Sequence, residues 1–216
     1  MTGLLEPALI VVILTNLAIT ASSRLAFGIR LVATQGVVAG LMPLVLSPEE
    51  VTVRLVVIGG LTVVLKGIVF PRLLDRTLRQ AAVRREEDPP FGYKASIVGG
   101  VVTLGLAFWL TGPNRMPLPA PLASPLQLPA AVFTLLTGLF LIVARNNALN
   151  QVLGYLVMEN GIFLIGLALA LEEPLLLEMG ILLDVFFGVL VMGVAIFHIS
   201  RAFDSIEVDE LTTLKD

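Results

Sequence analysis

The stretch QVLGYLVMENGIFLIGLALAL, residues 151–171, decides the fold class of this chain. A helix of about 20 apolar residues crosses the hydrocarbon core of a bilayer, and this stretch has that length and character. It nevertheless carries a carboxylate, Glu159, near its middle. The stretch therefore predicts a membrane-embedded helix with an ionisable group inside the bilayer, where such groups usually serve a function.

The composition of the whole chain supports this interpretation. Of its 216 residues, 56% are hydrophobic and 14% are charged, and the mean hydropathy is +0.95. Soluble domains are closer to half apolar and a quarter charged. The chain has no Cys and one His, His198, which excludes thiolate-held zinc, iron–sulfur clusters and a bis-His haem. We expect a membrane protein with no metal or cofactor of its own.

The hydropathy pattern predicts an all-α integral membrane protein with about seven transmembrane helices. Each span is a hydrophobic run of helical length bounded by charges, prolines or glycines. The runs are 7–22, 28–46, 51–70, 94–111, 128–144, 148–171 and 175–200. No cation precedes the first run and Arg24 follows it, so we expect an uncleaved anchor rather than a signal peptide.

The distribution of lysine and arginine predicts the orientation. Most of the 14 cations fall in the loops on one side of the predicted spans. These are Arg24, Arg30, Arg72, Arg76, Arg79, Arg84, Arg85, Lys94, Arg145, Arg201 and Lys215. Because cytoplasmic loops are enriched in cations, we expect the N-terminus outside and the C-terminus in the cytoplasm of a cell inner membrane.

The spans suggest three units. Residues 1–93 form an N-terminal three-helix unit with a cytoplasmic extension, 94–127 hold the fourth span and a proline-rich outer loop, and 128–216 form a second three-helix unit with an acidic cytoplasmic tail. The extension keeps a helical pattern beyond Pro71, with Asp75 and Arg79 at an i,i+4 spacing. It is either a helix facing lipid headgroups or a docking surface for a soluble partner.

Two acids lie at similar depth in neighbouring predicted spans. Glu159 is about twelve residues, or roughly 18 Å, from the cytoplasmic end of its span, and Asp184 is about sixteen residues, or roughly 24 Å, from that of the next. A mid-bilayer carboxylate costs at least ~2.5 kcal/mol, so such groups normally face a protein interior or a hydrated cavity. We expect the two carboxyls to lie side by side and to load and release protons. The alternative is that they only hydrogen-bond neighbouring helices and fix their register.

The surroundings of these acids give further candidates. Gly154 and Glu159 fall broadly on one helix face with the amides of Asn150 and Gln151, while Phe163 leads away from it. Lys66 is either a third member of the proton relay or a side chain that snorkels to the cytoplasmic headgroups, since Pro71 follows closely. His198 is expected at the cytoplasmic end of its span, as an interfacial imidazole or as a proton entry point.

A short internal similarity links two spans. LVATQGVVAG (31–40) and LVMENGIFLI (156–165) share Leu-Val and a Gly preceded by an amide. Thr34 then corresponds to Glu159, and the units before and after the fourth span would be parallel repeats.

The C-terminal half resembles the K subunit of NADH-quinone oxidoreductase and its relatives in multisubunit cation/proton antiporters. The resemblance rests on ARNNALNQVLGYLVMENGIFL (144–164) and DVFFGVLVMGVAIFHISRAFDSIEVDEL (184–211). The positions that match the family pattern are Gly154, Met158, Asn160, Asp184 and Gly188. One position departs: the family's first acid falls where this chain has Leu156, and Glu159 comes about one helical turn later on the same face.

With four preceding spans and IRLVATQG (29–36), the whole chain is similar to component E of hydrogenase-4, a membrane subunit of formate hydrogenlyase-type complexes. That resemblance implies a non-catalytic subunit of a complex-I-like oxidoreductase, without a cofactor. Its partners would be antiporter-like and quinone-site-like membrane subunits, with a soluble hydrogenase arm elsewhere. Glu159, Asp184 and Lys66 would belong to a path for protons or sodium ions.

Two other functions fit the same residues: a component of a cation/proton antiporter, and a purely structural scaffold subunit. No nucleic-acid or carbohydrate motif appears, so no nucleic-acid partner is expected. The glycine pair Gly59-Gly60 lacks the Lys-Ser/Thr of a nucleotide-binding phosphate loop.

Overall fold

The described part of the chain is almost entirely helical. The computed structural model describes residues 3–46, 53–80, 92–112, 115, 122–145, 148–169 and 193, and within these ranges it contains helices and no strand. The helices are α1 (Leu5–Thr20), α2 (Leu25–Leu46), α3 (Val53–Val64), the π-helical turn η1 (Leu65–Val69), α4 (Phe70–Gln80), α5 (Gly92–Leu110), α6 (Gln127–Ala144) and α7 (Ala148–Leu169). The all-α prediction is confirmed.

The first six predicted spans each coincide with a helix or a continuous run of helices. Four helices of the described chain are long and apolar enough to cross a membrane: Leu25–Leu46, Leu55–Arg79, Gln127–Ala144 and Leu149–Leu169. Leu5–Thr20 and Ala95–Leu110 are shorter apolar helices. The seventh predicted span, 175–200, lies outside the described residues.

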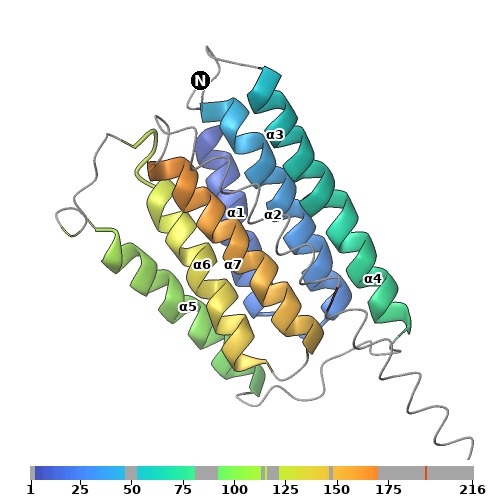
Figure 1. Ribbon diagram of the computed structural model, residues 1–216. Coiled ribbons are helices and arrows are strands. Elements are labelled where there is room, and N and C mark those ends of the chain that lie inside the picture. Colours follow the sequence, from blue (N-terminus) through green and yellow to red (C-terminus); the bar gives the residue numbers. More distant parts are fainter. Residues whose placement is uncertain are drawn as a thin grey trace, which may run out of the picture.

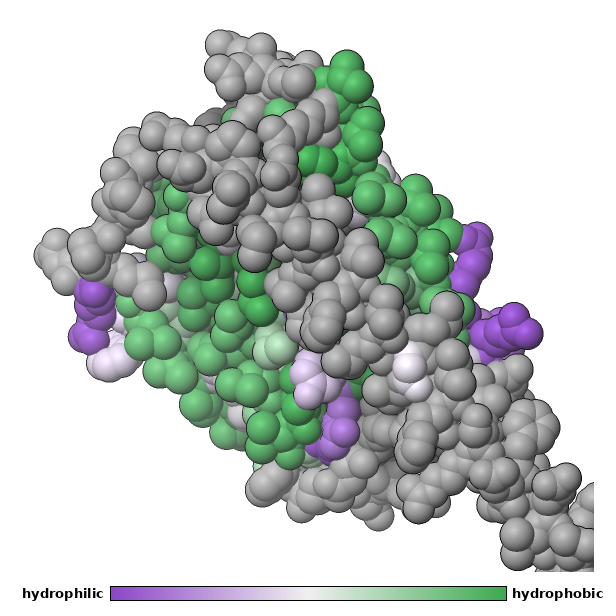
Figure 2. All heavy atoms as spheres, in the orientation of Figure 1, coloured by the Kyte–Doolittle hydropathy of each residue, from purple (hydrophilic) through white to green (hydrophobic). Residues whose placement is uncertain are grey.

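The helices form a bundle with their long axes roughly aligned (Figure 1). Helices α1, α2, α6 and α7 make up its centre, because α1 contacts both α2 and α6, and α7 contacts both α2 and α6. Helix α5 covers one flank through α6 and α1, and the run α3–η1–α4 covers the other through α2. Among the coloured residues on the face in Figure 2, apolar ones predominate, as expected for helices that contact lipid.

Glycines set the closest helix contacts. A Cβ added to Gly154 would lie 2.9 Å from the carbonyl oxygen of Gly138, and one added to Gly59 would lie 2.6 Å from the carbonyl oxygen of Gly40. The backbones of α6 and α7, and those of α2 and α3, therefore approach more closely than any side chain would permit. Small residues at helix interfaces commonly give such packing in membranes, where dispersion contacts replace the hydrophobic effect.

The helical run from Val53 to Gln80 changes its helical geometry in the middle. Pro71 has no backbone N–H, and its ring would clash with the carbonyl of residue 67 in a regular α-helix. The turn just before it, η1, widens to a π-helix, with the N–H of Phe70 bonded to the carbonyl oxygen of Leu65. A π-turn of this kind locally re-aims side chains and often marks functional sites.

Beyond this turn the helix continues to Gln80, as the sequence predicted. The predicted i,i+4 pair is present, with Arg79 Nη2 2.8 Å from Asp75 Oδ2. The apolar face of α4 is buried in the bundle. Phe70, Leu74 and Leu78 are buried in a core cluster that also includes residues of α2 and α7, and the exposed face of α4 carries Arg72, Arg76 and Arg79.

We predict that Gly138→Ala destabilises the bundle by about 1–3 kcal/mol, because the new methyl group meets backbone atoms of Met158 and Gly154. Gly105→Ala is the matched control, since a Cβ there has no neighbour within 4 Å, and it should leave stability unchanged or slightly raised. Thermal unfolding in detergent, followed by circular dichroism, measures both. Equal melting temperatures would contradict the close α6–α7 contact.

Candidate functional site

A buried ion pair lies in the interior of the bundle. Lys66 Nζ is 3.1 Å from Glu159 Oε1, and the two side chains are only 3% and 1% exposed. Glu159 lies near the middle of the 22-residue α7, and Lys66 lies near the middle of the continuous helical run from Val53 to Gln80. The sequence placed Glu159 near mid-bilayer, and the structure puts a cation beside it.

The position of Lys66 depends on the π-turn and on a glycine. Lys66 is the second residue of η1, and its Cβ packs against α2 where Gly36 has no side chain. A Cβ added to Gly36 would lie 2.5 Å from Lys66 Cβ and 3.1 Å from the Lys66 carbonyl carbon. Gly36 therefore lets the stem of Lys66 lie against the backbone of α2 and turn its amine into the bundle.

The position of Glu159 depends on α6. Gly154 and Gly161 flank Glu159 on α7, and both sit against α6: a Cβ on Gly161 would collide with the backbone of Leu135. This contact fixes the rotation of α7, which aims Glu159 at η1. One turn further on, the ring centroid of Phe163 lies 5.3 Å from Lys66 Nζ, within range of a cation–π interaction.

Two sequence interpretations need correction here. Phe163 does not lead away from the polar face. It comes four residues after Glu159, which is only about 40° further round an α-helix, and its ring faces the amine of Lys66. Lys66 does not snorkel to the headgroups, because its side chain is buried and paired with Glu159. The helix continues past Pro71 to Gln80, so this end of the helical run is further from Lys66 than the proline suggested.

A network of uncharged polar groups joins α1, α2 and α6. Gln35 Nε2 donates to Asn16 Oδ1 at 2.7 Å and to Thr15 Oγ1 at 2.9 Å. Asn16 Nδ2 in turn donates to Thr134 Oγ1 at 2.8 Å, and the Thr134 hydroxyl donates to the carbonyl oxygen of Ala130. All of these side chains are buried.

This network and the ion pair occupy one level of the bundle. Gln35 directly precedes Gly36, which contacts Lys66, and Thr134 directly precedes Leu135, which contacts Gly161 two residues after Glu159. The ion pair and the network together form what we call the polar layer: Thr15, Asn16, Gln35, Lys66, Thr134 and Glu159. It draws on α1, α2, η1, α6 and α7.

Some buried polar atoms of this region make no hydrogen bond within the described part of the chain. Asn160 is 2% exposed, yet neither its amide nitrogen nor its amide oxygen has a hydrogen-bond partner within the described part of the chain. The same holds there for the amide oxygen of Gln35 and the hydroxyl of Thr137. Buried polar groups of this kind commonly hold water.

A second buried cation lies at one end of the bundle. Arg145 follows α6 and is 2% exposed. Its Nη2 donates to the carbonyl oxygens of Thr20 at 3.3 Å and Ser22 at 3.4 Å. It therefore caps the C-terminus of α1, where a cation is favoured by the helix dipole. From the sequence, Arg145 is expected only in the turn between two predicted spans.

Three other residues that the sequence singled out are not part of this site as described. Asp184 and His198 lie outside the described residues, so the predicted pairing of Glu159 with Asp184 stays a prediction. Thr34, the proposed repeat equivalent of Glu159, is exposed and donates to the Arg30 carbonyl oxygen. Since Glu159 is buried, the two positions differ in environment, and it is Gln35 that faces the core.

Sequence reasoning missed Asn16 and Gln35 as members of the site. Each is an amide in the middle of an otherwise apolar span, which is the same signal that singled out Glu159. Within the described ranges, no group of three or more His, Asp or Glu side chains could hold a metal ion. The chemistry that this arrangement offers is the transfer of a proton between paired charges.

Comparison with known proteins adds an independent result. The protein-family model for NADH-ubiquinone/plastoquinone oxidoreductase chain 4L matches residues 127–216, which include Glu159. No solved structure matches the chain.

Two curated relatives cover more of the length. The chain is 32% identical to an uncharacterized protein of Mycobacterium tuberculosis, over 87% of this chain and 85% of the relative. It is 31% identical to hydrogenase-4 component E of Escherichia coli K12, over 69% of this chain and 68% of the relative.

We predict strong coupling between the two charged residues. Lys66→Met or Glu159→Leu alone leaves one buried charge unpaired, and each should cost about 3–5 kcal/mol of stability. The double variant removes both charges and should recover most of that loss. Unfolding in detergent of the three variants and the parent chain gives the coupling energy.

The exposed pair Asp75–Arg79 is the matched control. Because its side chains are 41% and 79% exposed, the same cycle there should give at most about 0.5 kcal/mol. Additive effects at Lys66 and Glu159 would show that the buried pair does not exist in the folded chain.

Proposed function

The chain belongs to the hydrogenase-4 component E family, and from this premise we propose that it is a non-catalytic membrane subunit of a hydrogenase or complex-I-like oxidoreductase. The match of its C-terminal half to oxidoreductase chain 4L supports the same assignment. The proposed role is to contribute ionisable residues to a path for protons or sodium ions through the membrane part of the complex.

The observation that carries this proposal is the buried pair of Lys66 and Glu159. Two charges in the interior of a membrane bundle each cost several kcal/mol in lost hydration, and a pair of apolar residues of similar volume would avoid that cost. The presence of this charged pair suggests a function that apolar residues could not perform. Intramembrane ionisable residues commonly mark proton relays.

The geometry suggests the elementary step. When the proton on Lys66 Nζ moves across the 3.1 Å gap to Glu159 Oε1, the charged pair becomes a neutral amine and a neutral carboxylic acid. A proton delivered to the amine and one withdrawn from the acid restore the ion pair. When delivery and withdrawal are concerted, each cycle carries one proton through the pair without leaving a lone charge in the apolar interior.

The polar layer is the proposed lateral continuation of this path. Asn16, Gln35 and Thr134 form a continuous chain of hydrogen bonds across three helices, and Asn160 has spare capacity to hold water beside Glu159. Chains of hydroxyls, amides and ordered waters can pass protons. We place Asp184 as the partner acid of Glu159 and His198 as a candidate entry point.

The proposed setting is a seven-span subunit of a cell inner membrane with its N-terminus outside and its C-terminus in the cytoplasm. The cation count of the loops supports this orientation. The partners would be antiporter-like and quinone-site-like membrane subunits and a soluble hydrogenase arm. The basic face of α4, on the predicted cytoplasmic side, is exposed, as such contacts would need.

We predict that removing the pair uncouples the complex without dismantling it. In the purified complex, reconstituted in liposomes, Lys66→Met/Glu159→Gln should abolish the ion gradient formed during redox turnover while electron transfer and subunit composition are kept. Glu6→Gln, the same change on the exposed start of α1, should retain the gradient. Measurements with and without sodium identify the ion. An unchanged gradient in the double variant would leave only the scaffold role.

The orientation has a separate test. Because the chain has no Cys, single cysteines at Gly3 and Arg79 are unique labels, and both positions are exposed. Three crossings separate them, so a membrane-impermeant thiol reagent added to intact cells should label Gly3→Cys and not Arg79→Cys. The reverse pattern would invert the proposed topology, and labelling of both would contradict an odd number of crossings.

A further inference from the structure

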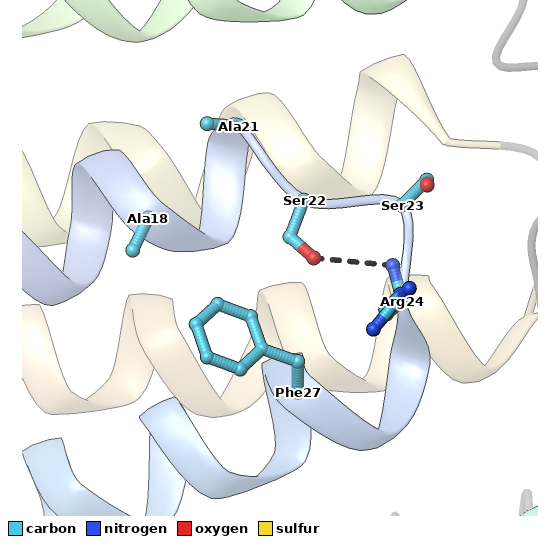
Figure 3. A pocket seen from close by; sticks show the side chains of 6 residues that line it. All are labelled: Ala18, Ala21, Ser22, Ser23, Arg24 and Phe27. Carbon is cyan, nitrogen blue, oxygen red and sulfur yellow. Dashed lines mark hydrogen bonds between the residues drawn. The ribbon is translucent and has the colours of Figure 1, made fainter.

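A pocket opens where α1 ends and α2 begins. It has a volume of about 490 Å³ and is lined by Ala18, Ala21, Ser22, Ser23, Arg24 and Phe27. Figure 3 shows the side chain of Ala18 and the ring of Phe27 toward the helical part of the pocket, with Ser22 and Arg24 at the turn. This volume lies within the usual range for small-molecule sites.

The lining is divided by polarity along the helix direction. Ser22, Ser23 and Arg24 provide two hydroxyls and a guanidinium at the turn, and none of the six lining residues is acidic. Ala18 and Phe27 provide the apolar part, and the Phe27 side chain is 44% exposed. Ser22 Oγ accepts a hydrogen bond from the backbone N–H of Arg24 at 3.1 Å, so its own O–H can be donated into the pocket.

Positive charge gathers around this end of the bundle. The guanidinium of Arg145 lies beneath the turn and bonds the carbonyl oxygens of Thr20 and Ser22. Arg24 itself is exposed. A ligand whose polar end is anionic would therefore meet a favourable potential at the turn and an apolar surface further along the helices.

The depth of the pocket identifies the kind of ligand. Helix α2 is long and apolar enough to cross a bilayer, and the pocket surrounds its first residues. The ends of a crossing helix lie at the headgroup level, where arginine side chains contact lipid phosphates. The apolar wall of Ala18 and Phe27 then faces the upper part of the acyl chains.

We propose that this pocket binds one anionic phospholipid. Its phosphate would accept hydrogen bonds from Arg24 and from the hydroxyls of Ser22 and Ser23, and its glycerol and first methylenes would pack on Ala18 and Phe27. Arginine suits this role because its planar guanidinium can bind a phosphate through two parallel hydrogen bonds.

Native mass spectrometry of the full chain tests this proposal, with phosphatidylglycerol and phosphatidylcholine added separately to detergent micelles. Phosphatidylglycerol should be retained and phosphatidylcholine should not. Arg24→Gln should weaken retention by about tenfold, as expected for the loss of a charge-assisted hydrogen bond. Arg30→Gln is the matched control, because Arg30 is exposed on the same helix outside the pocket, and it should retain the lipid.

A second variant tests the apolar half without changing the charge. Ala18→Phe fills the pocket beside Phe27 and should also release phosphatidylglycerol while circular dichroism shows an intact bundle. Inorganic phosphate, added at millimolar concentration, should not displace the lipid. Equal losses in Arg24→Gln and Arg30→Gln, retention in Ala18→Phe, or displacement by phosphate would each overturn the proposal.

Discussion

The contact between Lys66 and Glu159 is the constraint that the rest of the bundle has to satisfy. Both groups lose their hydration inside the bundle, and their mutual attraction offsets that loss only when the two charged atoms meet at hydrogen-bond distance. The observed separation of 3.1 Å meets this condition. It is reached because Gly36 lets α2 approach the stem of the lysine and because Gly161 seats α7 on α6 in the required rotation. The π-turn adds the adjustment that points the amine inward.

This arrangement gives a physical meaning to the family assignment. The chain carries no thiol, and its described residues include no group of three or more His, Asp or Glu side chains that could hold a metal ion. The bundle contains a buried charged pair, and a hydrogen-bonded network of amides and hydroxyls lies at the same level along its axis. The function proposed for this subunit rests on that pair and on the hydrogen-bonded side chains beside it.

The sequence predicted the elements well and their lateral contacts poorly, for physical reasons. Hydropathy and loop charges predict where helices run, so the six helical regions of the described chain and the pair Asp75–Arg79 were predicted. The partner of Glu159 could not be found this way, because pairing across a bundle depends on which glycines let helices approach. The depth of Lys66 was misjudged from Pro71, a residue that usually ends a helix but here sits just after a π-turn and leaves the helix intact. Asn16 and Gln35 were visible as isolated amides, yet only the packing shows that they bond to each other.

The most direct test of the central claim is a measurement of the Lys66–Glu159 contact itself. Solid-state NMR of the chain in lipid bilayers, with ¹⁵N at lysine Nζ and ¹³C at the glutamate carboxyl carbons, detects such pairs through their dipolar coupling. The chain has only three lysines, which keeps the assignment simple. The account predicts a strong lysine–glutamate cross-peak that disappears in Glu159→Gln and a Lys66 amine protected from exchange with water. A Lys66 amine that exchanges freely and shows no carboxyl neighbour would contradict it.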